Sequence, residues 1–174
     1  MASETIWTIG HSVRPIEDFI ELLRINGIAV VADVRRFPGS RWHPQFNERA
    51  LRESLAEQGI DYVWLPSLGG RRKPVPNSIN IAWRNEAFRG YADHIASDEF
   101  AEGLFELLMI ANGLPTAIMC SEAVWWRCHR SLIADVLRFI GFDVLHIMEG
   151  GKTVPHPMTA PARIHDGVLS YAED

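Results

Sequence analysis

Short apolar runs alternate along the chain with segments in which apolar residues recur every three or four positions. The apolar runs predict five strands, at residues 6–10, 28–34, 60–65, 115–119 and 142–147. The run at 28–34 is apolar apart from Asp33, which is typical of a strand buried on both faces of a parallel sheet. The pattern therefore predicts the strands of a largely buried sheet.

Segments with helical spacing separate these runs. The predicted helices begin near Pro15, Asn47, Ser97 and Leu132, and the glycines that end them are Gly27, Gly59, Gly113 and Gly141. A glycine directly after the last periodic residue is a common helix stop. Residues 66–85 show no period and are rich in Gly, Pro and Arg, so we expect a functional or mobile loop there. Residues 167–171 predict a short edge strand.

The alternation of strands and helices predicts an α/β fold. We expect a single domain over residues 1–174, a Rossmann-like three-layer fold with a mainly parallel five-stranded sheet. Right-handed crossovers would place helices on both faces of that sheet. In open sheets of this kind, ligands bind beyond the carboxyl ends of the strands. We therefore expect a site among the residues that follow the strands, which include His11, Asp33, Arg35, Gly69, Cys120, Glu122 and His146.

Several of these strand-end segments also carry a family resemblance. The chain resembles the domain of unknown function 488 family in TIGHS (8–12), DVRRFPGSRWHPQF (33–46), LPSLGGR (65–71), FRGYAD (88–93), MCSEAVWWRCHRSLIAD (119–135), LHI (145–147) and HPMT (156–159). The resemblance implies a single α/β domain with a shared site. It implies no reaction, because the family name records none.

Composition and charge exclude several classes of protein. Hydrophobic residues make up 47% and charged residues 22% of the chain, which excludes disordered, collagen-like and coiled-coil chains. The net charge of −5 argues against wholesale coating of nucleic acid or of an anionic membrane. We see no signal peptide, no apolar stretch of the roughly 20 residues that span a bilayer, and too few cysteines for a disulfide framework. We therefore expect a soluble, cytoplasmic protein.

The two cysteines stand at positions where a thiol can become reactive. Cys120 ends a predicted strand, and Cys128 stands just before a predicted helix whose positive end, with Arg127 and Arg130, favours a thiolate. The alternative is that both are small residues packed at a strand end. The layout is similar to that of thiol phosphatases and rhodaneses, but Arg127 follows Cys120 at a longer spacing than in those enzymes.

The carboxylates and histidines complete a catalytic hypothesis. We predict Cys120 and Glu122 as the reactive pair, with His11 or Asp33 assisting proton transfer. The alternative for Asp33 is that it pairs with Arg35, Arg36 or Arg130 and builds the site. Cys120, Cys128 and His129 contain zinc-ligand types, but their spacing matches no common zinc signature. We therefore predict no metal and no cofactor.

The arginines at the strand ends indicate anion binding. The predicted substrate-binding residues are Ser12, Arg35, Arg36, Arg41, Gly69, Gly70, Arg71, Ser121, Trp126, Cys128, His129 and Arg130. Guanidinium groups suit phosphate or carboxylate, and interleaved aromatic residues suit stacking on a base. No P-loop or G-x-G-x-x-G motif occurs, so ATP or NAD binding in the usual manner is not indicated.

Three hypotheses follow from these patterns. The first is an enzyme with an arginine-rich cleft for a small anionic substrate, for which a nucleotide-like molecule is one candidate. The second is a non-catalytic nucleotide or nucleic-acid binding module, and the third is a partner-binding protein with a vestigial cleft. None of them involves a membrane, and the oligomeric state stays open.

Overall fold

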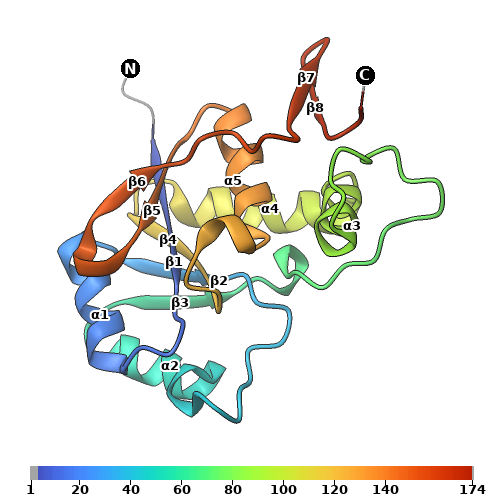
Figure 1. Ribbon diagram of the computed structural model, residues 1–174. Coiled ribbons are helices and arrows are strands. Elements are labelled where there is room, and N and C mark those ends of the chain that lie inside the picture. The colour runs from blue at the N-terminus through green and yellow to red at the C-terminus, as the bar shows by residue number, and fades with distance from the viewer. Residues whose placement is uncertain (1–3, 174) are drawn as a thin grey trace.

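The computed structural model describes residues 4–173 and is built around a six-stranded sheet in the order β3-β2-β4-β1-β5-β6 (Figure 1). Five strands are parallel: β1 (Thr5–Gly10), β2 (Val30–Asp33), β3 (Asp61–Trp64), β4 (Thr116–Cys120) and β5 (Asp143–Ile147). The sixth, β6 (Thr153–Pro155), is antiparallel to β5. The predicted α/β fold with a mainly parallel sheet is confirmed, and the predicted number of five strands is wrong.

The C-terminal strands differ from the expectation for physical reasons. β6 spans three residues, ends in Pro155 and exposes every side chain, so no apolar alternation marks it in the sequence. The predicted edge strand at 167–171 forms only as β8 (Val168–Ser170). It pairs with β7 (Arg163–His165) in a separate two-stranded hairpin and does not extend the central sheet.

Five α-helices within the described residues cover the two faces of the sheet (Figure 1). They are α1 (Ile16–Ile25), α2 (Glu48–Ala56), α3 (Glu86–Ile95), α4 (Asp98–Ala111) and α5 (Arg130–Phe139). Leu23 of α1 and Leu51 of α2 belong to the core on one face, whereas Leu107 of α4 and Leu132 of α5 belong to the core on the other. None of the helices in residues 4–173 is long and apolar enough to cross a membrane.

Helix α3 is not among the helices predicted from the sequence. Asn85 caps it, because its side chain accepts a hydrogen bond from the backbone N–H of Phe88. Phe88, Tyr91, Ala92 and Ile95 recur at helical spacing and pack in the same core as Leu107 and Leu132, so the apolar periodicity of an amphipathic helix is present in this segment. The helix is short, at 10 residues, and follows the irregular segment 66–85 directly.

A chain of buried hydrogen bonds links the start of α5 to β1 and β5. The Arg130 side chain, only 1% exposed, donates from Nη1 to Thr8 Oγ1 at 3.2 Å. Thr8 Oγ1 lies 2.5 Å from His146 Nδ1, and His146 Nε2 lies 2.8 Å from His156 Nδ1. Burial lowers the pKa of His146 to about 2, helped by the positive charge of Arg130. His146 is therefore an uncharged link in this chain at neutral pH.

The same chain ends on a buried carboxylate. His156 Nε2 lies 2.8 Å from Asp135 Oδ1, and Tyr171 donates its hydroxyl to Asp135 Oδ2 at 2.9 Å. Thr159 donates to the same carboxylate from both its backbone N–H and its hydroxyl. Donation from Arg130 toward Asp135 satisfies every group in the network, because a carboxylate only accepts. The C-terminal segment is thus tied to α5 by polar contacts within the core.

This network predicts that removal of the Asp135 carboxylate strongly lowers the stability of the fold. Asp135→Ala leaves several buried donors without a partner and should lower the free energy of unfolding by about 3–5 kcal/mol. Chemical denaturation monitored by far-ultraviolet circular dichroism measures the change. Glu102→Ala removes an exposed carboxylate from α4 and should stay within about 0.5 kcal/mol of the parent. Equal stabilities of the two variants would contradict the role given to Asp135.

Candidate functional site

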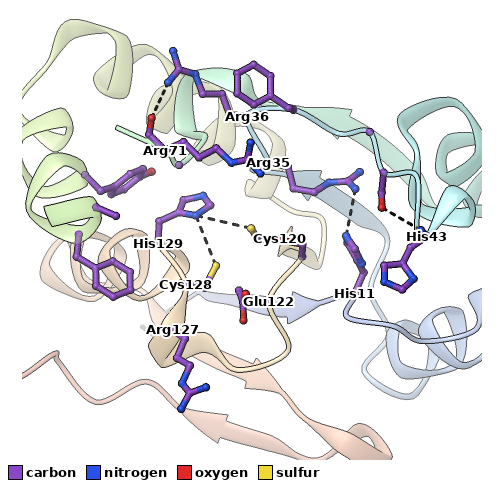
Figure 2. Close-up of a pocket in the computed structure, with 18 residues that line it drawn as sticks. His11, Arg35, Arg36, His43, Arg71, Cys120, Glu122, Arg127, Cys128 and His129 are labelled. Carbon is purple, nitrogen blue, oxygen red and sulfur yellow. Dashed lines mark hydrogen bonds between the residues drawn. The ribbon is translucent and has the colours of Figure 1, made fainter. Parts of the chain in front are cut away.

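A cleft of about 430 Å³ lies where the loops that follow β1, β2, β3 and β4 meet α3 (Figure 2). The carboxyl ends of parallel strands share one edge of the sheet, so these loops converge although they are distant in sequence. The predicted site residues that line the cleft are His11, Arg35, Arg36, Gly70, Arg71, Cys120, Ser121, Glu122, Cys128 and His129. Those that do not line it are Ser12, Asp33, Arg41, Gly69, Trp126 and Arg130.

The loop after β4 is fixed on the end of β1 by backbone contacts. The N–H of His11 donates to the Cys120 carbonyl at 2.9 Å, which extends the β1–β4 pairing past the strands. A Cβ on Gly10 would lie 1.8 Å from the carbonyl oxygen of Glu122, so only glycine allows this approach. Arg130 Nη2 donates to the same oxygen at 2.6 Å. The loop is therefore clamped between Gly10 and the start of α5.

Two thiols and an imidazole meet in this loop. His129 Nε2 donates to the Val34 carbonyl at 2.8 Å, which leaves Nδ1 as the ring atom that faces the two cysteines. Nδ1 lies 3.9 Å from Cys120 Sγ and 3.7 Å from Cys128 Sγ (Figure 2). We call Cys120, Cys128 and His129 the Cys–Cys–His cluster. Both thiols are free and buried.

The two cysteines differ in their electrostatic surroundings. Burial opposes ionisation of Cys128, but the hydrogen bond from Cys120 and the neighbouring His129 and Arg130 outweigh it and hold its pKa well below the usual range. Arg130 donates to Cys128 Sγ from its backbone N–H at 3.5 Å and from Nε at 3.4 Å. The hydrogen bond to Cys128, together with burial, raises the pKa of Cys120 well above the usual range. Of the two thiols, Cys128 is thus the more readily ionised.

Asp33 lies beneath the cleft and does not reach it. Its carboxylate is fully buried and accepts from Arg35 Nη2 at 2.7 Å and Nε at 2.9 Å, and from the Tyr62 hydroxyl at 2.5 Å. The structure therefore gives the second of the two interpretations of Asp33, a partner of Arg35 that builds the site. Arg35 keeps its Nη1 edge toward the cleft, where it lies 3.4 Å from His11 Nε2.

His11 is held in one orientation by its ring nitrogens and its stacking. Nδ1 donates to the Ser12 carbonyl at 2.9 Å, so Nε2 is left to accept from Arg35. The ring stacks on Phe46 with centroids 4.3 Å apart. Burial, reinforced by the charge of Arg35, lowers the pKa of His11 to about 4. The imidazole is therefore neutral at pH 7.

The lining of the cleft is positively charged. It contains four arginines, Arg35, Arg36, Arg71 and Arg127, and one carboxylate, Glu122. Among residues 4–173, only Arg35 of these four forms an ion pair with a carboxylate. The other three arginines form no ion pair with a carboxylate in this part of the chain.

Arg36 and Arg71 are organised around an exposed phenylalanine. Arg36 Nη1 donates to the Arg71 carbonyl at 2.9 Å, and Arg71 has a left-handed backbone with φ of 59°. Both guanidinium carbons lie over the ring of Phe37, at 5.5 Å and 5.7 Å from its centroid. The ring, 61% exposed, thus presents an aromatic surface beside two cations.

The paired glycines serve the protein's own packing. A Cβ on Gly70 would lie 2.9 Å from His129 Nδ1, and a Cβ on Gly69 would lie 2.7 Å from the Arg36 Cα. Gly69 and Gly70, both predicted as substrate-binding residues, thus allow the backbone to approach these two residues closely. Gly70 lets the loop after β3 pack on the ring of the Cys–Cys–His cluster.

Trp126, one of the predicted residues, lies outside the cleft, where it is 51% exposed and contacts Trp125 edge-on.

The predicted set also omitted part of the lining. The omitted lining residues include Phe37, Ser40, His43, Phe88, Tyr91 and Arg127. The signals for them were present in the family-like segments 33–46, 88–93 and 119–135, which contain all six. Tyr91 packs against His129 with ring centroids 5.0 Å apart.

Comparison with protein families identifies the family to which the chain belongs. Residues 15–137 match the model of Domain of unknown function DUF488. The chain belongs to the DUF488 family. The matched range includes the Cys–Cys–His cluster and all four arginines of the cleft, whereas His11 precedes it and β5 and β6 follow it. Neither the curated proteins nor the solved structures contain a match.

The buried His11 predicts a pH dependence of stability. Between pH 7 and 5 the unfolded chain protonates this histidine, with a pKa near 6.5, whereas the folded chain does not until about pH 4. Folding stability is therefore lost as the pH falls, by about 2 kcal/mol from this group between pH 7 and 5. His11→Asn keeps a donor for the Ser12 carbonyl and should remove this part of the loss. Denaturant titrations of both proteins at the two pH values measure it, and identical losses would contradict the assignment.

Proposed function

We propose that this DUF488 protein is an enzyme whose cleft binds a small anionic substrate that carries a planar ring. The observation that carries the proposal is the charge of the lining, four arginines against one carboxylate beside the Cys–Cys–His cluster. Arginine offers a planar fork that matches phosphate or carboxylate oxygens. Cations without a carboxylate partner, gathered at the carboxyl ends of parallel strands, are the setting in which α/β proteins bind such ligands.

The aromatic residues of the lining support a ring on the substrate. Phe37 is exposed in the cleft beneath two guanidinium groups, and Phe88 and Tyr91 line the wall that α3 contributes. A flat ring can stack on such surfaces, and an attached phosphate can bind the adjacent arginines. A nucleotide-like molecule combines both features, so we take nucleotides as the first substrate class.

The chemistry is assigned to the loop after β4. Cys120 and Glu122 lie two positions apart on this loop, and both line the cleft beside Cys128, the thiol whose pKa is lowered. Cys120, whose pKa is raised, contributes a protonated thiol. Glu122 is the one carboxylate of the lining, and His11 presents a neutral ring held by Arg35. Proton transfer beside a reactive centre needs groups of these types within reach of the substrate. Asp33 is left out of the reactive set because it is buried in its pair with Arg35.

Binding of adenosine 5′-monophosphate tests the composition of the cleft. We expect the nucleotide to bind more tightly than adenosine, which lacks the anion, and more tightly than inorganic phosphate, which lacks the ring. Arg71→Gln and Arg127→Gln should each weaken nucleotide binding by about 10-fold, the value of one charge-assisted hydrogen bond. Isothermal titration calorimetry measures the affinities.

Arg49→Gln is the matched control for these variants. Its side chain is 91% exposed on α2 and pairs with Glu53, away from the cleft lining. Nucleotide affinity should be unchanged in this variant. Equal affinity for adenosine and its monophosphate, or an equal loss in the control, would remove the proposed anion site.

Turnover separates an enzyme from a binding module. In a panel of nucleotides and phosphate esters, Cys120→Ser and Glu122→Gln should lower the rate of any reaction the parent catalyses by about 100-fold or more. Circular dichroism should show that both variants stay folded. If both retain the parent rate, the reactive pair is wrongly assigned.

The second candidate function is non-catalytic binding of single-stranded nucleic acid. The observation that favours it is the exposed Trp126, which lies on the same loop as Glu122 and offers a free aromatic surface. This function requires an affinity that falls steeply with salt and depends on Trp126. An affinity indifferent to salt and to Trp126→Ala would eliminate it.

A further inference from the structure

The Cys–Cys–His cluster has the donor atoms of a metal site. Cys120 Sγ, Cys128 Sγ and His129 Nδ1 all lie within 4.8 Å of one another. Each of these three atoms can donate a lone pair to a metal ion. The ligands are two thiol sulfurs and one imidazole nitrogen, with no carboxylate or amide among them. Soft thiolate sulfur combined with imidazole nitrogen is the ligand set that suits Zn²⁺.

The separations agree with a tetrahedral ion. Zinc–sulfur bonds of about 2.3 Å and zinc–nitrogen bonds of about 2.0–2.1 Å at the tetrahedral angle put sulfur and nitrogen about 3.6 Å apart. The two sulfur–nitrogen distances in the cluster are 3.9 Å for Cys120 and 3.7 Å for Cys128. An ion among the three atoms would therefore require shifts of only a few tenths of an ångström at these edges.

The surrounding groups already hold the ligands as an outer shell would. The Val34 carbonyl accepts from His129 Nε2, the type of contact that fixes a ligating histidine and turns its other nitrogen to the metal. Arg130 donates two hydrogen bonds to Cys128 Sγ, which supports negative charge on that sulfur. Gly70 and Tyr91 pack against the His129 ring.

From this geometry we infer that Cys120, Cys128 and His129 bind one Zn²⁺ ion, with the fourth coordination position open to the cleft. All three ligands line the cleft, so the ion would face the anion site. Two cysteines and one histidine with an open position form a known class of catalytic zinc site. Each metal–sulfur bond forms as the sulfur gives up any proton it carries, and these protons pass to solvent.

The prediction of no metal was based on the absence of common zinc signatures, and those signatures do not describe a site of this kind. Its ligands come from the end of β4 and from the two residues that precede α5, which the intervening loop brings together. Local zinc motifs describe ligands from one turn or one hairpin, so they do not cover this arrangement. The inference concerns the metal alone and does not depend on which anion the cleft binds.

Metal binding by the full chain tests this inference. Reduced protein freed of metal should bind one equivalent of Co²⁺ with the thiolate charge-transfer absorption and intense visible bands of a tetrahedral site, and Zn²⁺ should displace it. Cys128→Ser should weaken Zn²⁺ binding, measured against a chromophoric chelator, by about 100-fold or more, at or above the effect of losing an outer-shell partner. His43→Asn changes a cleft histidine outside the cluster and should leave the Zn²⁺ affinity unchanged.

A measurement on the unaltered protein covers the case in which the cysteine variant fails to fold. One equivalent of Zn²⁺ should protect both cysteines from alkylation in the native state, and removing it with a chelator should restore labelling. Labelling that ignores Zn²⁺, Co²⁺ spectra without thiolate bands, or rapid closure of a Cys120–Cys128 disulfide in the presence of Zn²⁺ would overturn the inference. Nucleotide binding by Arg71→Gln and Arg127→Gln, measured in metal-free protein, separates failure of the metal site from failure of the anion site.

Discussion

The buried guanidinium of Arg130 is the interaction on which both the core and the cleft depend. A charge removed from water is tolerated only where its hydrogen bonds are satisfied. Arg130 meets this condition with Thr8 Oγ1 of β1 and with Cys128 Sγ and the Glu122 carbonyl of the loop after β4. One side chain therefore sets the electrostatics of a thiol, the position of a loop and the start of a buried polar network.

This arrangement explains why Arg130 differs from the arginines of the cleft. Arg36, Arg71 and Arg127 face the cavity and form no ion pair with any carboxylate in residues 4–173. Arg130 is 1% exposed and donates its hydrogen bonds to groups inside the protein. The guanidinium group of Arg35 contacts both Asp33 and His11. The arginines of this region therefore fall into two groups. Arg35 and Arg130 shape the site, whereas the other three are available to a ligand.

The edge of the sheet at which the site lies was predictable from the sequence, whereas the depth of each side chain was not. Because parallel strands end on the same side, the residues after β1, β2 and β4 had to approach one another. Whether Asp33 or Arg130 reaches the cavity depends on partners such as Tyr62 and Thr8, which no spacing rule identifies. The lining from α3 was predictable as well, because Phe88, Tyr91, Ala92 and Ile95 recur at helical spacing in that segment.

The Cys–Cys–His cluster likewise could be predicted from the sequence only in part. Cys128 and His129 are adjacent in sequence, and Cys120 joins them only because the loop between them folds back onto β1. The contact requires the glycine at position 10 and the clamp from Arg130. The types of the three side chains could therefore be read from the sequence, whereas their arrangement in space is set by the tertiary fold.

The buried chain from Thr8 to Tyr171 bears on where this unit ends. The family match covers residues 15–137, yet Asp135 within it accepts from His156 and Tyr171 beyond it, and Arg130 within it donates to Thr8, which precedes it. A chain shortened to the matched range would lose these partners of the buried carboxylate and of the buried guanidinium. The buried polar network thus extends beyond the matched range in both directions, to Thr8 before it and to Tyr171 after it.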